Sequence, residues 1–167
     1  YTGTVRMPIP ENIGEMTLPL AGLDLSLTAV RLPGITHVIV PLNVFEALSQ
    51  PGQSSRELAA LAVREWAPLI DAEAFGVIMY DPKTQSIAPL VHVKTSRTTV
   101  WERGCGSGSA AVGAYMARAG MKSVTANISQ PGGVIEVSAE FEDGAVSGVS
   151  IAGYVRIVAR GTVYISI

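Results

Sequence analysis

The only cysteine of this chain of 167 residues is Cys105, and it lies in a glycine-rich turn. The surrounding segment reads Trp101-Glu102-Arg103-Gly104-Cys105-Gly106-Ser107-Gly108-Ser109. A β-type run ends at Trp101 and helix formers follow Ser109, so the thiol is predicted to lie at a helix N-terminus. The backbone N–H groups and the helix dipole there favour anions and lower the pKa of a thiol. A thiolate in this position can be a nucleophile or can carry a proton.

Two charged residues come directly before this turn. Arg103 can clamp a carboxylate, and Glu102 can bind an ammonium group. A site that offers both suits a zwitterionic amino acid. The competing interpretation is a solvated pair at a strand end, which is the usual place of such a dipeptide.

Two histidines point to other chemistries. A cysteine hydrolase needs a base beside the thiol, and His37 and His92 are the candidates. Each lies in a β-type run, where a lone histidine is more often a hydrogen-bonded structural residue. Together with Cys105 they could bind zinc, but their spacing matches no ligand pattern, so we expect no metal site.

The glycines of the turn are also compatible with two kinds of phosphate-binding loop, a dinucleotide fingerprint and a Walker A loop. Gly106-x-Gly108-x-x-Ala111 follows a predicted strand and opens a helix, as in a dinucleotide fingerprint, but residues 125–131 contain no acidic residue to bind a ribose. No lysine follows the glycines, which excludes a Walker A loop. The sequence also leaves open a third interpretation, in which the domain has no catalytic role and binds a carboxylate or phosphate at the helix start.

The composition is that of a folded domain. Hydrophobic residues make up 48% of the chain and charged residues 16%. The net charge of −2 and the scattered basic residues predict no nucleic-acid partner and no anionic membrane surface. The lone cysteine excludes an internal disulfide and favours a reducing, cytoplasmic location. No apolar run approaches the roughly 20 residues of a membrane span, no signal peptide opens the chain, and the first residue, Tyr1, suggests processing or a segment of something longer.

Strands dominate the elements that must position the turn. They are predicted over residues 5–8, 15–20, 25–32, 36–42, 75–80, 87–94, 98–101, 123–129, 134–141, 146–159 and 162–165. Apolar and polar side chains alternate along residues 134–141, as in a half-buried strand, and Asp143-Gly144 then predicts a hairpin turn.

Two helices are predicted. The first is amphipathic and begins at Ser54, where Glu57 completes a capping box, and Pro68 prevents it from continuing. The second, residues 107–119, is apolar almost all round and is therefore expected to be buried on most sides, with Gly120 as its C-terminal glycine.

The order of these features resembles a known family. A strand, Glu-Arg-Gly, and then Cys-Gly-Ser-Gly-Ser at the start of a small-residue helix are similar to the C-terminal half of diaminopimelate epimerase and its relatives. These are cofactor-independent amino-acid racemases and epimerases, and a histidine racemase is among them. Gly34-Ile35-Thr36-His37-Val38 falls where the family has its Gly-Asn-Pro-His strand, and the closing segments at residues 153–155 and 159–161 also match.

The resemblance implies an α+β, diaminopimelate epimerase-like domain, in which a mainly antiparallel curved sheet or barrel wraps around a buried central helix. Residues 1–167 would be a single domain, the C-terminal half of a two-domain protein. In the family each domain presents one cysteine; one thiolate removes the α-proton and the other thiol reprotonates the opposite face. The implied activity is that of a PLP-independent isomerase with no cofactor.

The resemblance also assigns roles to residues. Cys105 is one of the two catalytic thiols, and Gly106 and Ser107 contribute N–H groups that bind the substrate carboxylate. Glu102, Arg103 and His37 are further substrate-binding candidates.

Three departures from the family pattern bear on this assignment. Gly104 runs directly into Cys105, where the family places several residues between Glu-Arg-Gly and the cysteine. Ile35 replaces the substrate-binding Asn, which argues against diaminopimelate and leaves another amino acid, histidine included. The chain has no second cysteine. The second thiol therefore comes from a missing N-terminal domain or from a second copy of the chain. The remaining possibility is that Cys105 alone acts, from one face of the substrate.

Overall fold

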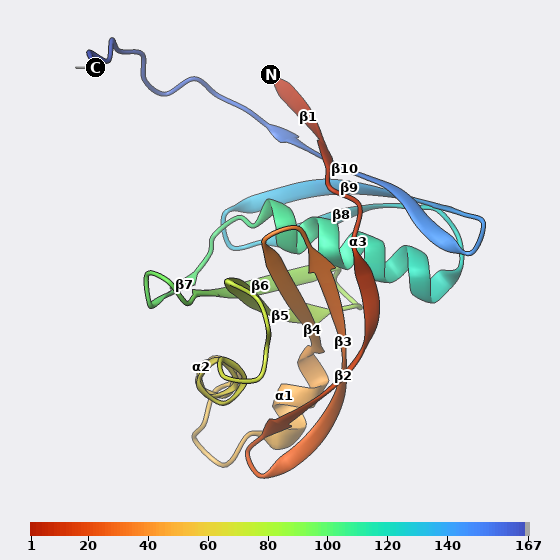
Figure 1. Cartoon of the computed structure of the whole chain (residues 1–167), viewed down its shortest axis with the longest axis vertical. Helices are drawn as coiled ribbons and strands as arrows, with labels where there is room; N and C mark the ends of the chain where they lie inside the picture. Colours follow the sequence, from red (N-terminus) through yellow and green to blue (C-terminus); the bar gives the residue numbers. More distant parts are fainter. Residues whose placement is uncertain (166–167) are drawn as a thin grey trace.

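The computed structural model describes residues 1–165, which form ten strands and three helices (Figure 1). The strands are β1 (Thr2–Met7), β2 (Asn12–Leu20), β3 (Leu23–Leu32), β4 (Ile35–Pro41), β5 (Ala74–Asp81), β6 (Ser86–Val93), β7 (Thr98–Trp101), β8 (Val124–Gln130), β9 (Gly133–Glu142) and β10 (Ala145–Tyr154). The helices are α1 (Leu42–Leu48), α2 (Ser55–Trp66) and α3 (Gly106–Gly120). This mixture confirms the α+β class.

The strands form one sheet in the order β1-β10-β9-β8-β6-β5-β4-β3-β2, and β7 pairs with β6 beside this path. Most neighbours are antiparallel, but β4 pairs with β5 in parallel, and β6 pairs with β8 in parallel at Ser86 and Ser129. Parallel neighbours need a crossover, and the chain between β4 and β5 uses it to form α1 and α2. The β9–β10 turn places Asp143 (φ 50°) and Gly144 (φ 80°) in the left-handed region that a two-residue hairpin of this kind requires, so the predicted hairpin is confirmed.

The two faces of the central strands hold separate cores. Helices α1 and α2 cover one face, where Phe45 and Trp66 are buried. Helix α3 covers the other face. The pleat divides β4 between the two cores, because Val38 packs with α1 and α2 whereas Ile39 packs with α3. By the same alternation His37 lies on the α3 face.

Helix α2 begins as predicted. The Glu57 N–H donates to the Ser54 hydroxyl oxygen, and the Ser54 N–H donates to the Glu57 carboxylate at 2.7 Å. The predicted capping box is therefore confirmed, and the helix ends at Trp66, two residues before Pro68.

Helix α3 packs against β8, β9 and β10 on one side and against β2, β3 and β4 on the other (Figure 1). Eight of its 15 residues are buried. At Gly113 an added β-carbon would lie 2.4 Å from Cγ2 of Val137, so a glycine is needed for this helix to lie so close to β9. The helix ends slightly later than predicted, because the left-handed residue after it is Met121 (φ 49°) rather than Gly120.

Other element predictions need correction. Helix α1 is absent from the sequence prediction, since seven residues are too few to show a helical period. The predicted strand 146–159 is too long, because β10 ends at Tyr154, and the predicted strand 162–165 does not form. The Val155 N–H donates to the Tyr1 carbonyl at 2.7 Å, and beyond it residues 156–165 run away from the body without a neighbouring strand in the described chain (Figure 1).

We find no helix within residues 1–165 that has both the length and the apolar character to cross a membrane.

Candidate active site

Cys105 caps the N-terminus of α3 with its own sulfur. Its backbone is extended (φ −121°), and its carbonyl accepts the first helical hydrogen bond, from the Ser109 N–H at 3.0 Å. The Gly108 N–H donates to Sγ at 3.2 Å, which is the bond that a serine or aspartate oxygen makes at an ordinary N-cap. The predicted placement of the thiol at a helix N-terminus is confirmed.

Of the backbone N–H groups at the start of this helix, some donate a hydrogen bond within the chain and others have no acceptor. The Cys105 N–H donates to Oε1 of Gln130 at 2.6 Å, and the Gly108 N–H is taken by the sulfur. The N–H groups of Gly106 and Ser107 have no acceptor within residues 1–165. Two free donors at the positive end of a 15-residue helix have the chemistry to hold an anion such as a carboxylate.

Gln130, the last residue of β8, fixes this helix start and was missed by the sequence analysis. Its Nε2 donates to Oγ of Ser109 at 2.8 Å, and that hydroxyl donates to the Cys105 carbonyl at 2.9 Å. The glutamine amide therefore closes a ring of hydrogen bonds around the cysteine backbone. A polar residue directly before the Pro131-Gly132-Gly133 turn was the available signal, but its contact with Cys105 depends on the packing of α3 against β8.

His37, Ser107 and Cys105 form a chain of contacts. Nε2 of His37 lies 2.9 Å from Oγ of Ser107, and that oxygen lies 3.6 Å from Sγ of Cys105. Burial lowers the pKa of His37 to about 4, so its ring is neutral at pH 7. His37 is fully buried and reaches the thiol only through Ser107.

The thiol does not ionise as readily as its place in the sequence suggests. Burial raises the pKa of Cys105 to about 11, and the neighbouring Glu102 carboxylate adds to the rise. Hydrogen bonds from Ser107 and from the Gly108 N–H act in the opposite direction. The prediction that the helix start lowers the thiol pKa is wrong, because desolvation and a nearby negative charge outweigh the helix donors.

The two charged candidates before the cysteine have different places. The Glu102 carboxylate faces the thiol, and its N–H donates to the Pro89 carbonyl at 3.0 Å. Arg103 is exposed, and its side chain makes no hydrogen bond or ion pair with any residue from 1 to 165. Its carbonyl accepts from the Gly132 N–H at 2.6 Å, and a β-carbon at Gly132 would lie 2.7 Å from that oxygen. The arginine backbone thus joins the cysteine turn to the β8–β9 turn.

His92 lies away from this site. It pairs with Phe75 across β5 and β6, and the two rings lie 5.4 Å apart in the core of α1 and α2. Its Nδ1 is 2.8 Å from Oγ1 of Thr99. Since α3 covers the opposite face of the sheet, His92 cannot serve as a base for Cys105. Within residues 1–165 no group of three or more His, Cys, Asp or Glu side chains is placed to hold a metal ion.

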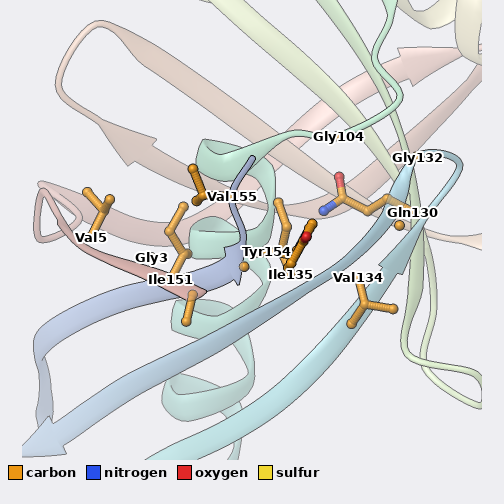
Figure 2. A pocket seen from close by; sticks show the side chains of 13 residues that line it. Gly3, Val5, Gly104, Gln130, Gly132, Val134, Ile135, Ile151, Tyr154 and Val155 are labelled. Atoms are coloured by element: carbon orange, nitrogen blue, oxygen red, sulfur yellow. The ribbon is translucent and has the colours of Figure 1, made fainter. Parts of the chain in front are cut away.

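A pocket of about 340 Å³ opens beside the helix start (Figure 2). Gly104 and Gln130 line it next to the cysteine turn, and on the other side it is lined by Ile151 and Tyr154 of β10 and by Val155, the residue after this strand. Its lining is largely apolar. Ile151 joins this pocket to the helix start, because a β-carbon at Gly106 would lie 3.0 Å from its Cδ1.

Comparison with known proteins gives a consistent picture. Residues 1–164 match the family model described as the histidine racemase CntK N-terminal domain. The chain is 28% identical over 166 residues to a histidine racemase of Fusobacterium nucleatum, covering 99% of the chain and 57% of that protein. It is 26% identical over 164 residues to a histidine racemase of Staphylococcus aureus, covering 96% of the chain and 57% of that protein. The chain thus spans just over half the length of these curated relatives.

The fold has a solved counterpart. A hydroxyproline epimerase from Agrobacterium vitis, determined with bound trans-4-hydroxy-L-proline, superposes with a TM-score of 0.53 and 17% identity. The superposition covers 91% of this chain and 50% of that one. At this identity the similarity concerns the fold alone.

The expected resemblance to amino-acid racemases and epimerases is confirmed by these matches. The family description names an N-terminal domain, whereas the motifs of the sequence indicate a C-terminal half, so the position of the chain within a longer protein stays a prediction. Because the match extends over residues 1–164, the chain belongs to the histidine racemase CntK N-terminal domain family.

Proposed function

We propose that this chain is one half of an amino-acid racemase or epimerase in which Cys105 exchanges the α-proton of the substrate. The observation that carries the proposal is the pair of free N–H groups, on Gly106 and Ser107, directly beside the Cys105 sulfur. A substrate carboxylate held by these donors brings its α-carbon next to the thiol.

The environment of the thiol suits a proton carrier. An amino-acid α-proton is very weakly acidic, so its removal needs a strong base and fixed dipoles that stabilise the developing negative charge. With a pKa of about 11 the Cys105 sulfur rests as a thiol, which is a proton donor, and its thiolate is a strong base when it forms. The two N–H groups at the helix start would stabilise charge that spreads from the α-carbon onto the carboxylate.

A second acid–base group must work on the opposite face of the α-carbon. Cys105 is the only cysteine of the chain, so the partner thiol would come from the remaining part of a longer protein or from a second copy of the chain. We infer that the sheet curves around α3 so that the start of this helix faces the partner across a cleft. The thiols and the helix dipoles supply the chemistry, and the proposal uses no PLP or other cofactor.

The substrate class is an amino acid. Histidine is the first amino acid to test, because relatives of the chain carry the name histidine racemase. Ile35 stands where the family has its substrate-binding Asn, so we expect a substrate without a second polar carboxyl end. The need for a reduced thiol fits a cytoplasmic location.

Exchange of the α-proton is the decisive measurement. The chain, alone and within the full-length protein that contains it, is incubated with L- and D-histidine in D₂O, and deuterium at the α-carbon is followed by NMR. We expect exchange by the full-length protein, loss of exchange in Cys105→Ser, and an unchanged rate in Lys122→Ala, an exposed residue just beyond the far end of the same helix. No exchange with any amino acid, or full exchange by Cys105→Ser, would contradict the proposal.

A non-catalytic anion-binding module is the second candidate. The observation in its favour is that this chain by itself supplies both free N–H groups, which is all that anion binding needs. It does not supply the second thiol that racemisation needs. Amino-acid binding by wild type and Cys105→Ser with equal affinity, without exchange in any assembly, would select this alternative.

A further inference from the structure

His37 is a polar ring in a fully buried position. Its exposed fraction is 0%, and it lies in β4 between two other buried residues, Thr36 and Val38. A buried imidazole is costly unless its nitrogens are hydrogen-bonded. One nitrogen meets this demand, because Nε2 lies 2.9 Å from Oγ of Ser107. The other, Nδ1, has no hydrogen-bond partner among residues 1–165.

The neighbouring strand makes room for this ring. Gly76 of β5 is the register partner of His37, and a β-carbon at Gly76 would lie 2.3 Å from Nδ1. Any larger residue at this position would push the ring out of its place. The missing side chain at Gly76 therefore sets the distance between His37 and the start of α3.

The unequal partners of the two nitrogens decide which one carries the proton. A neutral imidazole has one donor and one acceptor nitrogen. If Nδ1 carried the proton, a buried N–H would have no acceptor. If Nε2 carries the proton, the group without a partner is the lone pair of Nδ1. A buried acceptor without a donor costs less free energy than a buried N–H without an acceptor. Nε2–H then donates to Oγ of Ser107, and the hydroxyl proton of Ser107 is left to point elsewhere. The sulfur of Cys105, 3.6 Å away, is the acceptor within reach.

We propose that His37 is a positioning residue for Cys105: its neutral ring donates from Nε2 to Ser107 and so directs the Ser107 hydroxyl toward the sulfur, where it favours the thiolate. The low pKa of His37, about 4 because of burial, keeps the ring neutral over the working range. Glu102 is the charged group that faces the thiol, and it acts in the opposite sense to Ser107. The proposed function enters only in giving Cys105 the role of proton carrier, because the hydrogen-bond chain itself can be tested without any reaction.

Nitrogen NMR of the imidazole tests the tautomer directly. The chain is labelled at histidine, and His37→Gln identifies the His37 signals. We expect a neutral ring at pH 7 with the proton on Nε2. A proton on Nδ1, or a charged ring at this pH, would overturn the proposal.

Carbon NMR of labelled cysteine tests the effect on the thiol, and the single cysteine gives a single signal. His37→Gln places an amide N–H where Nε2 stands, whereas His37→Asn places it where Nδ1 stands. At about pH 10 we expect the thiolate-to-thiol ratio to fall about tenfold in Ser107→Ala and in His37→Asn, which corresponds to a rise of about one unit in the thiol pKa. His37→Gln should restore most of the ratio.

Gly76→Ala provides a test that leaves every hydrogen-bonding group in place. It should displace the ring and lower the thiolate ratio as His37→Asn does, with circular dichroism and thermal unfolding to show that each variant is folded. An unchanged ratio in folded His37→Asn would mean that the ring only fills space. A higher ratio would mean that Ser107 donates to His37 in the wild type. Either result overturns the proposal, whereas failure of the proposed function appears separately, as absent α-proton exchange.

Discussion

Glu102 is the charged residue that opposes ionisation of Cys105. The thiol pKa is raised first by burial and then by the Glu102 carboxylate, which accepts a hydrogen bond from the S–H form and repels the thiolate. We expect Glu102→Gln to lower the thiol pKa by about one unit, because the negative charge is lost while the size is kept. Titration of the single cysteine signal by carbon NMR measures the shift.

Glu142→Gln, an exposed residue in β9, is the matched control and should leave the midpoint unchanged. Since the folded thiol pKa lies above that of a free thiol, the thiolate fraction grows as pH rises toward 11, and Glu102→Gln should shift this growth to lower pH. An identical midpoint in Glu102→Gln and wild type would show that burial alone raises the pKa.

Gln130 holds the cysteine backbone by accepting from one group and donating to another. Gln130→Leu removes the acceptor of the buried Cys105 N–H and the donor to Ser109, so we expect unfolding to become easier by about 1–3 kcal/mol. Chemical denaturation measures this change. Gln130→Glu keeps the acceptor but loses the donor, and should therefore lose less. Equal stability of wild type and Gln130→Leu would refute the structural role.

The residues of the site differ in how far the sequence reveals them. The place of Cys105 and of the free N–H groups on Gly106 and Ser107 follows from local signals, namely a strand end, glycines and helix formers. Gln130 reaches the site only because α3 packs against β8, and His37 only because the pleat of β4 turns its ring toward α3. The sign of the thiol pKa shift depends on burial and on where the Glu102 carboxylate points, and neither can be read from a turn of nine residues.

At the scale of elements, α3 depends on small residues where it meets β9. Gly113→Ala normally favours a helix by about 1 kcal/mol, but here the new β-carbon would lie 2.4 Å from Val137, so we expect net destabilisation. Gly120→Ala is the matched control in the same helix, because its nearest new contact, with Lys122, is at an ordinary 3.5 Å. We expect thermal unfolding at lower temperature for Gly113→Ala and at equal or higher temperature for Gly120→Ala.

The double variant with Val137→Ala identifies the cause. Removing the two methyl groups of Val137 makes room for the new β-carbon. Gly113→Ala should therefore destabilise the Val137→Ala variant less than it destabilises the wild type. Additive losses in the double variant would place the clash elsewhere.

Elements with a complete local signature were predictable, and those that depend on neighbours were not. The capping box at Ser54 and Glu57 and the left-handed pair Asp143-Gly144 are set by a few adjacent residues, and both form as predicted. The apolar residues beyond Tyr154 have strand-like composition but no neighbouring strand in residues 1–165, so composition alone overstates the length of β10. Helix α1 exists because β4 and β5 are parallel and need a crossover, which is a property of the sheet.

At the scale of the whole molecule, the sheet order places the first strand of the chain beside the last. β1 pairs with β10, and both line the pocket next to the start of α3. Segments from the beginning, the middle and the end of the chain therefore meet at one site. This convergence explains why the site needs the folded domain as a whole, although its most visible motif spans only nine residues.

The stability of the whole domain should also depend on one buried side chain in acid. The pKa of His37 is about 4 in the folded state, below the ordinary value of 6.5, so the unfolded chain binds a proton that the native state excludes. The free energy of unfolding should therefore fall as pH falls from 6.5 toward 4, by about 3 kcal/mol. Urea unfolding at a series of pH values measures this loss. His37→Gln, which cannot titrate, should remove most of it, whereas His92→Gln, on the other face of the sheet, should keep it. The same acid loss in His37→Gln and wild type would assign the effect to other groups and would refute the prediction.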